Sequence, residues 1–399
     1  MKAKTILIAG GGIGGLATAL GLSRKGFRSI VLEQAQEFGE IGAGIQLGPN
    51  AFHAFDTLGI GEEARARAVF IDQLRLMDAT TGEEITHIPL DAPFRQRFGN
   101  PYAVVHRGDL HAAMLAACRA SPLVELRTRH AVTGYAQDGS IVRALLRDHD
   151  AVEGDLLVGA DGLRSAIRAQ LVRDGDPRVS GHSTFRSVIP TEQMPEDLRW
   201  NAATLWAGPK VHLVHYPLTG WKLFNLVVTC HNDPGKAVAG EPVELEEVRR
   251  WFGHIHPRAQ QIVEHGRNWK RWVLCDRDPV STWVDGRVTI LGDAAHPMLQ
   301  YAAQGACMAL EDAVCLSYML ASHDTFDDAL AAYQKLRTIR TGRLQLLSRA
   351  IGEYIYHPAG ANAAIRNGVM SSMKPKEYYD RLSWLYGGTG LGEHIGNPG

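Results

Sequence analysis

Apolar and polar positions repeat along this chain in two different patterns, which predict two kinds of sheet. Short apolar runs at residues 5–9, 29–32, 155–162 and 287–291 are typical of buried strands. From residue 184 to about 284 the pattern changes to alternating strands separated by Pro and Gly turns, which predicts a mainly antiparallel sheet. We expect this second sheet to determine the specificity of any ligand that binds between the two.

Helical composition follows most of the buried strands. The expected helices span residues 16–24, 104–118, 165–171, 305–320 and 331–355, and a further strand spans 74–78. The last helix carries four arginines that we interpret as a solvated face: Arg337, Arg340, Arg343 and Arg349. The terminal segment is rich in aromatic residues, which either pack on their own domain or form a contact between two copies of the chain: Tyr378, Tyr379, Trp384 and Tyr386.

Composition excludes several classes of protein. A formal net charge of -1 over 399 residues, with no long run of Lys or Arg, lacks the electrostatic surface of a nucleic-acid-binding protein. No uninterrupted apolar stretch is long enough to span a bilayer. The five cysteines lack CxxC spacing and the 17 histidines lack HExxH, so we expect reduced thiols, no metal and a cytoplasmic enzyme. The length predicts two domains, one of them built from discontinuous segments.

A glycine-rich loop, Gly10-Gly11-Gly12-Ile13-Gly14-Gly15, connects the first strand to the first helix. The spacing of Gly10, Gly12 and Gly15 lets the backbone turn sharply and approach a pyrophosphate, while the helix N-terminus offers unpaired amides. Glu33 ends the next strand, about 20 residues past the last glycine, where a carboxylate accepts hydrogen bonds from ribose hydroxyls. The pattern predicts a dinucleotide without a 2′-phosphate.

A second loop, Gly292-Asp293-Ala294-Ala295-His296-Pro297, follows the strand at 287–291. Asp293 stands at the carboxyl end of that strand, where it could accept hydrogen bonds from a ribityl chain or serve only as a turn residue. The helix that begins at Gly305 and Ala306 would direct its amides at an isoalloxazine ring and stabilise the negative charge of its reduced form. The two loops together predict bound FAD.

These residues resemble the FAD-dependent aromatic hydroxylases, also called group A flavoprotein monooxygenases, over essentially the whole chain. Three motifs carry the resemblance in this order: GGGIGG with Glu33, GADGLRSAIR with Asp161, and LGDAAHP with Asp293. Arg107, in the segment HRGDL, matches a family position that contacts the ribityl chain or the pyrophosphate. Gln34 is a departure, because many members carry Arg there. The cofactor-binding residues are thus expected to be Gly10, Gly12, Ile13, Gly14, Gly15, Glu33, Gln34, Arg107, Asp161, Gly292, Asp293, Pro297, Gly305 and Ala306.

The resemblance implies an α/β fold with a Rossmann-like FAD-binding domain, a mainly antiparallel substrate domain and a helical C-terminal region. We assign the FAD-binding domain to residues 1–72, 101–183 and 285–350. The substrate domain is assigned to residues 73–100 and 184–284, and the helical tail to 351–399.

Within the family the chain is most similar to 3-hydroxybenzoate 6-hydroxylases, through the stretches at 101–102, 211–217 and 297–301. The resemblance implies that NADH and O2 serve to convert 3-hydroxybenzoate into 2,5-dihydroxybenzoate (gentisate) through a flavin C4a-hydroperoxide. No second glycine fingerprint is present, so NADH is expected to dock transiently as a cosubstrate. The oligomeric state stays open between a monomer and a homodimer.

Candidate substrate residues lie on the strand at 211–217 and near it. The side chains of His212 and Tyr216 lie on one face of that strand. His215 lies on the opposite face and is interpreted as structural. A lone histidine such as His212 is more often a core or surface residue, but the resemblance favours a role for it in the reaction. An unperturbed imidazole pKa would suit it to take a proton from a phenol, whose ordinary pKa is about 10. Three further residues are expected at the pocket: Gln300, to hydrogen-bond the developing phenolate, and Tyr102 and Tyr216, to hold the ring or carboxylate.

Some assignments keep an alternative. Asp72 is either a pocket residue suggested by the resemblance or an acid in a turn at a strand edge. For the reaction, the alternative inside the family is a salicylate 1-hydroxylase, which releases catechol and CO2. Gln300 distinguishes the two by resemblance, because salicylate hydroxylases typically carry Pro there. Two alternatives lie outside the family. One is a flavoprotein that oxidises or senses a ligand without inserting oxygen, and the other is a nicotinamide dehydrogenase.

Overall fold

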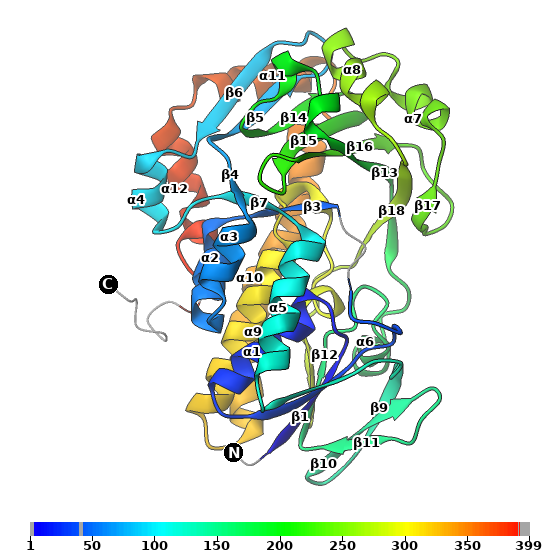
Figure 1. Ribbon diagram of the computed structural model, residues 1–399, viewed down its shortest axis with the longest axis vertical. Helices are drawn as coiled ribbons and strands as arrows, with labels where there is room; N and C mark the ends of the chain where they lie inside the picture. Colours follow the sequence, from blue (N-terminus) through cyan, green and yellow to red (C-terminus); the bar gives the residue numbers. More distant parts are fainter. Residues whose placement is uncertain (1–3, 40–42, 390, 392–399) are drawn as a thin grey trace.

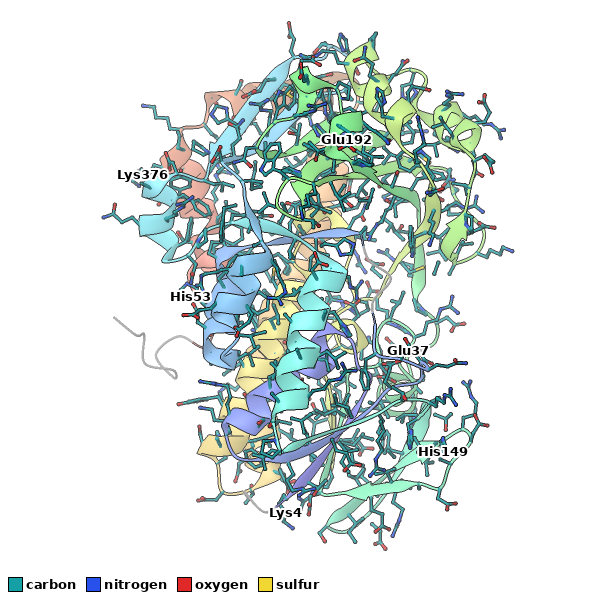
Figure 2. All side chains as sticks on the ribbon, in the orientation of Figure 1. Lys4, Glu37, His53, His149, Glu192 and Lys376 are labelled. Atoms are coloured by element: carbon teal, nitrogen blue, oxygen red, sulfur yellow. The ribbon has the colours of Figure 1, made fainter. Side chains whose placement is uncertain are left out.

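Two sheets at opposite ends of the molecule are joined by long helices that run between them (Figure 1). The computed structural model describes residues 4–39, 43–389 and 391. Polar side chains such as Lys4, His149 and Lys376 project from the outside of the molecule (Figure 2).

The first sheet has six strands in the order β19-β20-β12-β1-β2-β8. The strands are β1 (Thr5–Ala9), β2 (Arg28–Leu32), β8 (Val124–Arg127), β12 (Leu156–Gly159), β19 (Val284–Asp285) and β20 (Val288–Ile290). All neighbours are parallel except β19 and β20. The buried apolar strands predicted from the sequence are therefore confirmed as the parallel core of an α/β fold.

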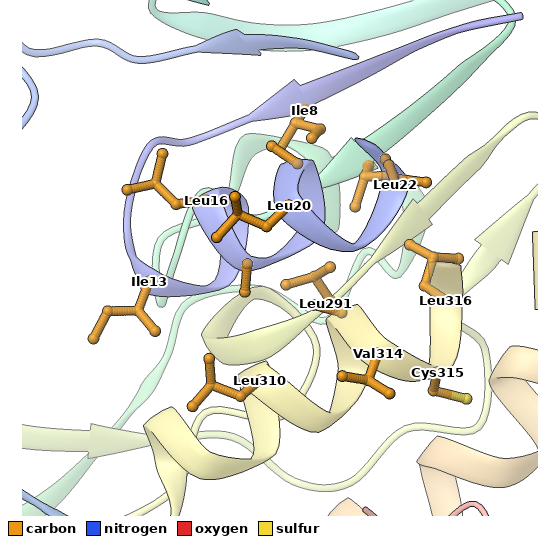
Figure 3. Close-up of a cluster of buried hydrophobic side chains, with 14 of the residues drawn as sticks. Ile8, Ile13, Leu16, Leu20, Leu22, Leu291, Leu310, Val314, Cys315 and Leu316 are labelled. Carbon is orange, nitrogen blue, oxygen red and sulfur yellow. The ribbon is translucent and has the colours of Figure 1, made fainter. Parts of the chain in front are cut away.

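Helices α1 (Ile13–Arg24) and α5 (Arg107–Ala120) pack at this sheet, and α9 (Gly305–Ser322) packs against α1. Leu16 and Leu20 of α1 contribute to the same core cluster as Leu310 and Val314 of α9 (Figure 3). A Cβ at Gly21 would lie 2.8 Å from Oγ of Ser317, so glycine allows the two helices to approach closely. This contact brings the N-termini of α1 and α9 to the same side of the sheet.

Two three-stranded sheets flank this region. They comprise β9 (Val132–Asp138), β10 (Ile141–Leu146) and β11 (Val152–Gly154), and β3 (Gly44–Leu47), β7 (Ala103–His106) and β4 (Val69–Phe70). The expected helix at 104–118 begins too early, because residues 103–106 pair with β3 as a strand. The three consecutive apolar residues before His106 favour this strand, and α5 begins only at Arg107. Helices α2 (Pro49–Leu58), α3 (Gly61–Arg67) and α4 (Ala92–Phe98) lie between these strands in sequence.

The second sheet has eight strands in the order β17-β18-β13-β16-β15-β14-β5-β6. They are β5 (Gln73–Asp78), β6 (Glu84–Pro89), β13 (Arg178–Pro190), β14 (Ala202–Gly208), β15 (Val211–Leu218), β16 (Leu223–His231), β17 (Ala239–Pro242) and β18 (Lys270–Asp276). Only β5 and β14 pair in parallel, so the prediction of a mainly antiparallel sheet is confirmed.

Two helices in this second region were not predicted from the sequence. Helices α7 (Leu245–Phe252) and α8 (Pro257–His265) pack with strand residues in a core cluster of their own. Short 3₁₀ helices η1 (Thr191–Gln193) and η2 (Glu196–Leu198) precede β14. Val248 and Phe252 are the buried residues of α7, so its periodicity is too brief to stand out in the sequence.

The C-terminal region is helical, as predicted. Helix α10 (Phe326–Ile351) continues into a single π-helical turn, η5 (Gly352–Tyr356), before α11 (Gly360–Ser372) and α12 (Pro375–Tyr386). Tyr378, Tyr379 and Tyr386 are buried, so these aromatic side chains pack on their own chain.

The four arginines of α10 do not share one solvated face, because only Arg343 is exposed, so the prediction is wrong for the other three. Arg337 is 1% exposed and forms ion pairs with Glu311 and Asp312 of α9. Arg340 also pairs with Glu311, Arg349 pairs with Asp276, and Arg343 stacks on Trp384. The partners come from distant segments, so the local charge pattern could not reveal them.

The structure does not show where one predicted domain segment ends and the next begins. Strand β13 runs without interruption from Arg178 to Pro190, across the predicted boundary at 183. The boundaries of all six segments stay a prediction, and parts of the first and last segments lie outside the described residues.

All five cysteines are in the described part of the chain and are free thiols, four of them buried. None of the helices described here is both long and apolar enough to cross a membrane.

Candidate active site

A cavity of about 890 Å³ lies between the two sheets and is lined by residues of both. Its volume is near the upper end of the roughly 300–1,000 Å³ typical of ligand pockets. One wall comes from the carboxyl ends of β1, β2 and β12 with the starts of α1 and α9. The other wall comes from β13, β15 and β16. We refer to them as the nucleotide wall and the sheet wall.

The N-terminus of α1 forms the centre of the nucleotide wall. Gly10, Gly12, Ile13 and Gly14 line the cavity, and no side chain caps this helix or places an acid in its first turn. Gly15 lies behind them, where a Cβ would be 1.9 Å from the carbonyl oxygen of Gly10. The wall therefore presents backbone amides, which suit a pyrophosphate.

The carboxylate of Glu33 also lies at this wall. It accepts hydrogen bonds from the backbone amides of Gly11 at 2.7 Å and Ala35 at 2.8 Å. Gln34, next to it, lines the cavity as predicted. The two amides fix the orientation of the carboxylate beside the space that the sequence assigned to a ribose.

The start of α9 provides a second uncapped helix N-terminus. Gln304, Gly305 and Ala306 line the cavity, with no side-chain cap and no acid in the first turn. Gly292 has a φ of +57°, a left-handed conformation that favours glycine, and the exposed Asp293 lines the cavity beside it. A reduced flavin dinucleotide has two anionic parts, the pyrophosphate and one edge of the flavin ring. The N-terminus of α1 suits the pyrophosphate, and the N-terminus of α9 suits the ring edge.

Three further predicted cofactor residues occupy different places. Arg107, the first residue of α5, lines the cavity. Asp161 lines it as well, but its carboxylate accepts hydrogen bonds from Oγ of Ser165 at 2.5 Å and the amide of Ala166 at 2.8 Å. Asp161 thus holds the start of α6 (Ala166–Leu171) in addition to facing the cavity. Pro297 is buried and is not among the described lining residues, so the structure does not bring it to the cavity.

A buried ionic cluster behind α9 fixes the 292–296 loop. Asp312 is fully buried and accepts hydrogen bonds from the amide of Gly292 at 2.9 Å and from Arg337 at 2.7 Å. Nε2 of His296 lies 2.5 Å from the same carboxylate. His296 and Arg337 lower the pKa of Asp312 to about 2, against the effect of burial. The sequence analysis missed Asp312. The available signal was an acidic residue in the second turn of the helix that follows LGDAAHP.

The sheet wall carries the predicted substrate side chains. His212, Val214 and Tyr216 of β15 all line the cavity, as expected for alternate residues of one strand. His215 is buried on the opposite face between Trp200 and Phe224. Burial and Arg75 lower the pKa of His215 to about 3. The polar wall formed by an imidazole and a phenol is therefore present.

Gln300 lies at the junction of the two walls, in the 3₁₀ helix η4 (Gln300–Ala302). Its Oε1 accepts a hydrogen bond of 3.0 Å from Nη2 of Arg186, and its Nε2 donates to Oγ1 of Thr229 at 3.1 Å. These partners orient the amide at the cavity.

Arg186 of β13 is a lining residue that the sequence analysis missed. Its side chain is half-buried, and its guanidinium donates to Gln300 and lies over the ring of Trp272. Its Nε is buried without a hydrogen-bond partner, and no ion pair is formed with an acid among the described residues. Burial lowers the pKa of Arg186, which nevertheless stays charged because an arginine is so strongly basic. A half-buried cation that faces a cavity favours an anionic ligand such as a carboxylate. A lone Arg in the alternating segment FRSVIP was the only local signal.

Burial changes the expected chemistry of His212. The side chain is 1% exposed, and burial together with His182 and His231 holds its pKa well below the usual range. The sequence analysis assumed an unperturbed pKa, which is wrong for this environment. Nδ1 of His212 lies 2.7 Å from Nε2 of His357, which leaves Nε2 of His212 for a group in the cavity. His212 is thus a neutral imidazole able to accept a proton.

The other two predicted substrate residues are not at the cavity. Tyr102 is buried behind Gln46, which does line the cavity, and its hydroxyl donates to Oε1 of Gln46 at 2.7 Å. Asp72 is exposed between β4 and β5 and is not among the described lining residues. The structure therefore supports the reading of Asp72 as an acid at a strand edge, and Tyr102 can act on a ligand only through Gln46.

Residues 3–344 match the family described as the FAD binding domain. The chain is 55% identical over 382 residues to 3-hydroxybenzoate 6-hydroxylase 1 of Aquipseudomonas alcaligenes, covering 96% of this chain and 97% of that protein. The chain belongs to the FAD-dependent aromatic hydroxylase family. A 3-hydroxybenzoate 6-hydroxylase of Polaromonas naphthalenivorans strain CJ2 is 48% identical, covering 96% and 95% of the two chains. The predicted family and FAD cofactor are confirmed.

Solved structures of the hydroxylase fold agree in architecture. HpxO of Klebsiella pneumoniae, complexed with FAD and uric acid, has a TM-score of 0.85 at 24% identity and covers 96% of each chain. A salicylate hydroxylase in a substrate complex has a TM-score of 0.80 at 24% identity, covering 96% of this chain and 95% of that one. At these identities the likeness establishes the fold alone.

Proposed function

We propose that this hydroxylase uses NADH and O2 to convert 3-hydroxybenzoate into 2,5-dihydroxybenzoate. The relatives named above are 3-hydroxybenzoate hydroxylases, and the observation in this chain that supports an aromatic acid is the half-buried Arg186 at the cavity. One oxygen atom of O2 is inserted formally into the ring C–H bond para to the hydroxyl and becomes the new hydroxyl group. The other oxygen atom leaves as water, and NADH with one proton supplies the two electrons and leaves as NAD+.

The residues of the nucleotide wall would hold FAD. The amides of α1 bind the pyrophosphate, Glu33 binds the ribose, and Asp293 with the start of α9 binds the ribityl chain and the ring. When bound, FAD accepts a hydride from NADH and activates O2. The site roles assigned to these residues are proposals that the flavin content of single variants can test.

The sheet wall would orient the substrate. Arg186 binds the carboxylate through charge-assisted hydrogen bonds, and Gln300, held by Arg186 and Thr229, donates to the substrate oxygen. His212 takes the hydroxyl proton at Nε2, because a phenol with a pKa of about 10 is a weaker nucleophile than its phenolate near neutral pH. A cation and a base on one wall fix both substituents, so the ring can present one carbon to the flavin.

The decisive experiment incubates the holoenzyme with NADH and labelled O2 against 3-hydroxybenzoate and salicylate separately. We expect 2,5-dihydroxybenzoate with one labelled oxygen from 3-hydroxybenzoate. Catechol from salicylate would move the assignment to a salicylate 1-hydroxylase, and NADH oxidation that yields only hydrogen peroxide with both acids would contradict the proposed substrate.

Arg186 gives a second test of the substrate class. Replacing the charge in Arg186→Met should raise the KM for 3-hydroxybenzoate by on the order of a hundredfold, since hydrogen bonds to charged groups contribute about 1.5–3 kcal/mol. The matched substrate 3-hydroxybenzamide should lose far less, because it carries no charge. Equal losses for the acid and the amide would show that Arg186 does not bind the carboxylate.

We also propose a cytoplasmic homodimer. A cytoplasmic location fits the five free thiols and the need for NADH. A dimer is supported by large apolar side chains exposed on α10 and α11, among them Ile339 at 75% and Ile365 at 64% exposure. Light scattering of the purified holoenzyme would detect a single-chain mass if the dimer does not form.

A further inference from the structure

The residue that precedes α9, Gln304, has a side-chain amide nitrogen without a partner at the cavity. Gln304 is 1% exposed and lines the cavity. Its Nε2 is buried and forms no hydrogen bond within the described residues, whereas its Oε1 accepts one from Nδ2 of Asn50 at 2.9 Å. A buried donor has lost its hydrogen bonds to water, so a ligand that accepts a hydrogen bond is its expected partner.

A buried carboxylate fixes the orientation of this amide. The oxygen and nitrogen of an amide are told apart by their partners, and an ionised carboxylate can only accept hydrogen bonds. Glu311 is fully buried, and its Oε1 accepts from Nδ2 of Asn50 at 2.8 Å. The same Nδ2 donates to Gln304, which must therefore turn Oε1 toward Asn50 and keep Nε2 for another acceptor.

Two arginines of α10 hold Glu311 in place. Nη1 of Arg337 and Nε of Arg340 both donate to Oε2 of Glu311 at 2.7 Å. Arg340 also donates to the carbonyl oxygens of Trp384 and Leu385, at 2.6 and 2.9 Å, near the end of α12. The C-terminal helices therefore fix the carboxylate on which the orientation of the amide depends.

Gln304 lies at the start of α9, where the flavin ring is expected. A Cβ at Gly48 would lie 3.1 Å from Nε2 of Gln304, which places this nitrogen beside the end of β3. Residues 44–46 of β3 and 305–306 of α9 also line the cavity. Oδ1 of Asn50 lacks a partner among the described residues as well, but Asn50 is not one of the described residues that line the cavity. Within this network, Gln304 is therefore the residue that can offer its donor to a ligand.

A flavin ring supplies the acceptor that such a donor requires. Its pyrimidine edge carries two carbonyl oxygens. Reduction by two electrons and one proton adds one negative charge to the ring, and a hydrogen bond to a charged oxygen is roughly twice as strong as one to a neutral oxygen. A donor at this edge therefore stabilises reduced FAD more than oxidised FAD.

We propose that Nε2 of Gln304 donates a hydrogen bond to a carbonyl oxygen of the flavin ring and raises the reduction potential of bound FAD, with Asn50 and Glu311 as the residues that orient it. This role rests on the proposed placement of FAD at the nucleotide wall and is independent of the aromatic substrate. A hydride from NADH supplies both electrons and leaves NAD+, and the hydrogen bond changes only how favourable that transfer is. Through Glu311, the C-terminal helices contribute to the properties of the cofactor.

The test measures the two-electron reduction potential of the substrate-free holoenzyme by anaerobic equilibration with a reference dye. Gln304→Met keeps the length of the side chain and removes the donor. We expect the ratio of reduced to oxidised FAD at a fixed potential to fall about tenfold in this variant, which corresponds to about 30 mV. Asn50→Leu should lower the potential by part of that amount, because Gln304 can then rotate, and it serves if Gln304→Met fails to fold.

Gln304→Glu adds a test that depends on pH. The variant keeps the bond from Asn50 but carries a carboxyl oxygen in place of Nε2. Compared with the unchanged enzyme at each pH, its potential should be close to normal at low pH, where the carboxyl group is protonated and donates. It should be lower at high pH, where the carboxylate repels the reduced ring. A difference that stays constant with pH would overturn the proposed contact.

The matched control is Gln345→Met. Gln345 is another buried glutamine, 2% exposed, and is not among the described residues that line the cavity. Its Nε2 donates to the carbonyl oxygens of Arg277 and Pro297, at 3.0 and 3.2 Å. This variant should lose stability but keep the reduction potential of the unchanged enzyme. A shift equal to that of Gln304→Met would show that the loss of any buried amide disturbs the flavin, and would overturn the proposal.

Flavin analogues separate a direct contact from packing. The enzyme is reconstituted with 2-thio-FAD or 4-thio-FAD, in which a sulfur atom, a weak acceptor, replaces one carbonyl oxygen. The effect of Gln304→Met should shrink with the analogue altered at the contacted position and persist with the other. Equal effects with FAD and both analogues would overturn the direct contact.

The flavin content of Asp293→Ala shows which assignment fails if the potential does not change. Unchanged potentials in Gln304→Met and Asn50→Leu, with flavin lost from Asp293→Ala, would overturn the role of Gln304 alone. Unchanged potentials with full flavin content in Asp293→Ala would overturn the placement of FAD at the nucleotide wall, and the role of Gln304 with it.

Discussion

The two walls of the cavity are built in different ways. The nucleotide wall consists of short consecutive segments, 10–14 and 304–306 among them, that present backbone amides at helix N-termini. The sheet wall consists of single side chains from separate elements, such as Arg186, His212 and Gln300. A cofactor shared by a whole family can be held by main-chain geometry, whereas a particular substrate requires side chains that differ between members.

The largest expected effect is on the sheet wall. His212→Ala should lower kcat by on the order of a hundredfold to ten-thousandfold, the usual contribution of a positioned base. FAD absorbance per protein should stay the same, because His212 is on the wall opposite the nucleotide residues. Stopped-flow measurement of the hydroxylation rate would check this prediction, and unchanged turnover across pH would exclude His212 as the base.

Asp312→Asn should loosen the 292–296 loop of the nucleotide wall. It leaves the buried Arg337 with one fewer anionic partner, and breaking a buried ion pair costs about 3–5 kcal/mol of unfolding free energy. Denaturant unfolding of the apoprotein measures this loss.

The unchanged protein and the Asp312→Asn variant should also differ in how their stability changes with pH. The pKa of Asp312 is about 2 in the folded chain and about 3.9 when unfolded, so its stabilisation is complete above about pH 5 and is lost progressively as the pH falls through 2. The Asn variant should lose less stability than the unchanged protein over that interval. Parallel curves would contradict the role of Asp312.

Asp293→Ala should weaken the nucleotide wall alone. Loss of one or two hydrogen bonds to the ribityl chain should raise the Kd for FAD by about tenfold, or ~1–1.5 kcal/mol. Flavin fluorescence during dilution of the holoenzyme measures the release. A variant that retains its full flavin content would show that Asp293 is only a turn residue.

The smallest effect is expected at Asp72. Asp72→Asn should change kcat and KM by less than about twofold, because a surface substitution away from the cavity usually alters free energy by no more than ~0.5 kcal/mol. A clear rise in the KM for 3-hydroxybenzoate, with kcat unchanged, would contradict this prediction and place Asp72 in the sheet wall.

Local patterns predicted the elements that depend on neighbours in sequence. The apolar strands and the glycine loop are specified by residues within one strand, turn and helix, so their placement around β1 and α1 agreed with expectation. The strand at residues 103–106 was mistaken for part of a helix, since its pairing partner β3 lies about sixty residues earlier. Arg337 was misjudged for the same reason, because its acidic partners lie on another helix.

The sequence by itself determined the family, the flavin and the side chains that face one side of β15, because each depends on motif spacing or on the two-residue period of a strand. Only the tertiary structure decided which charges are buried and which histidines touch. Burial took away the water that would otherwise set the pKa of His212, and folding brought His357 within hydrogen-bonding distance across 145 residues of chain. A contact between such distant residues is a property of packing, and no local pattern contains it.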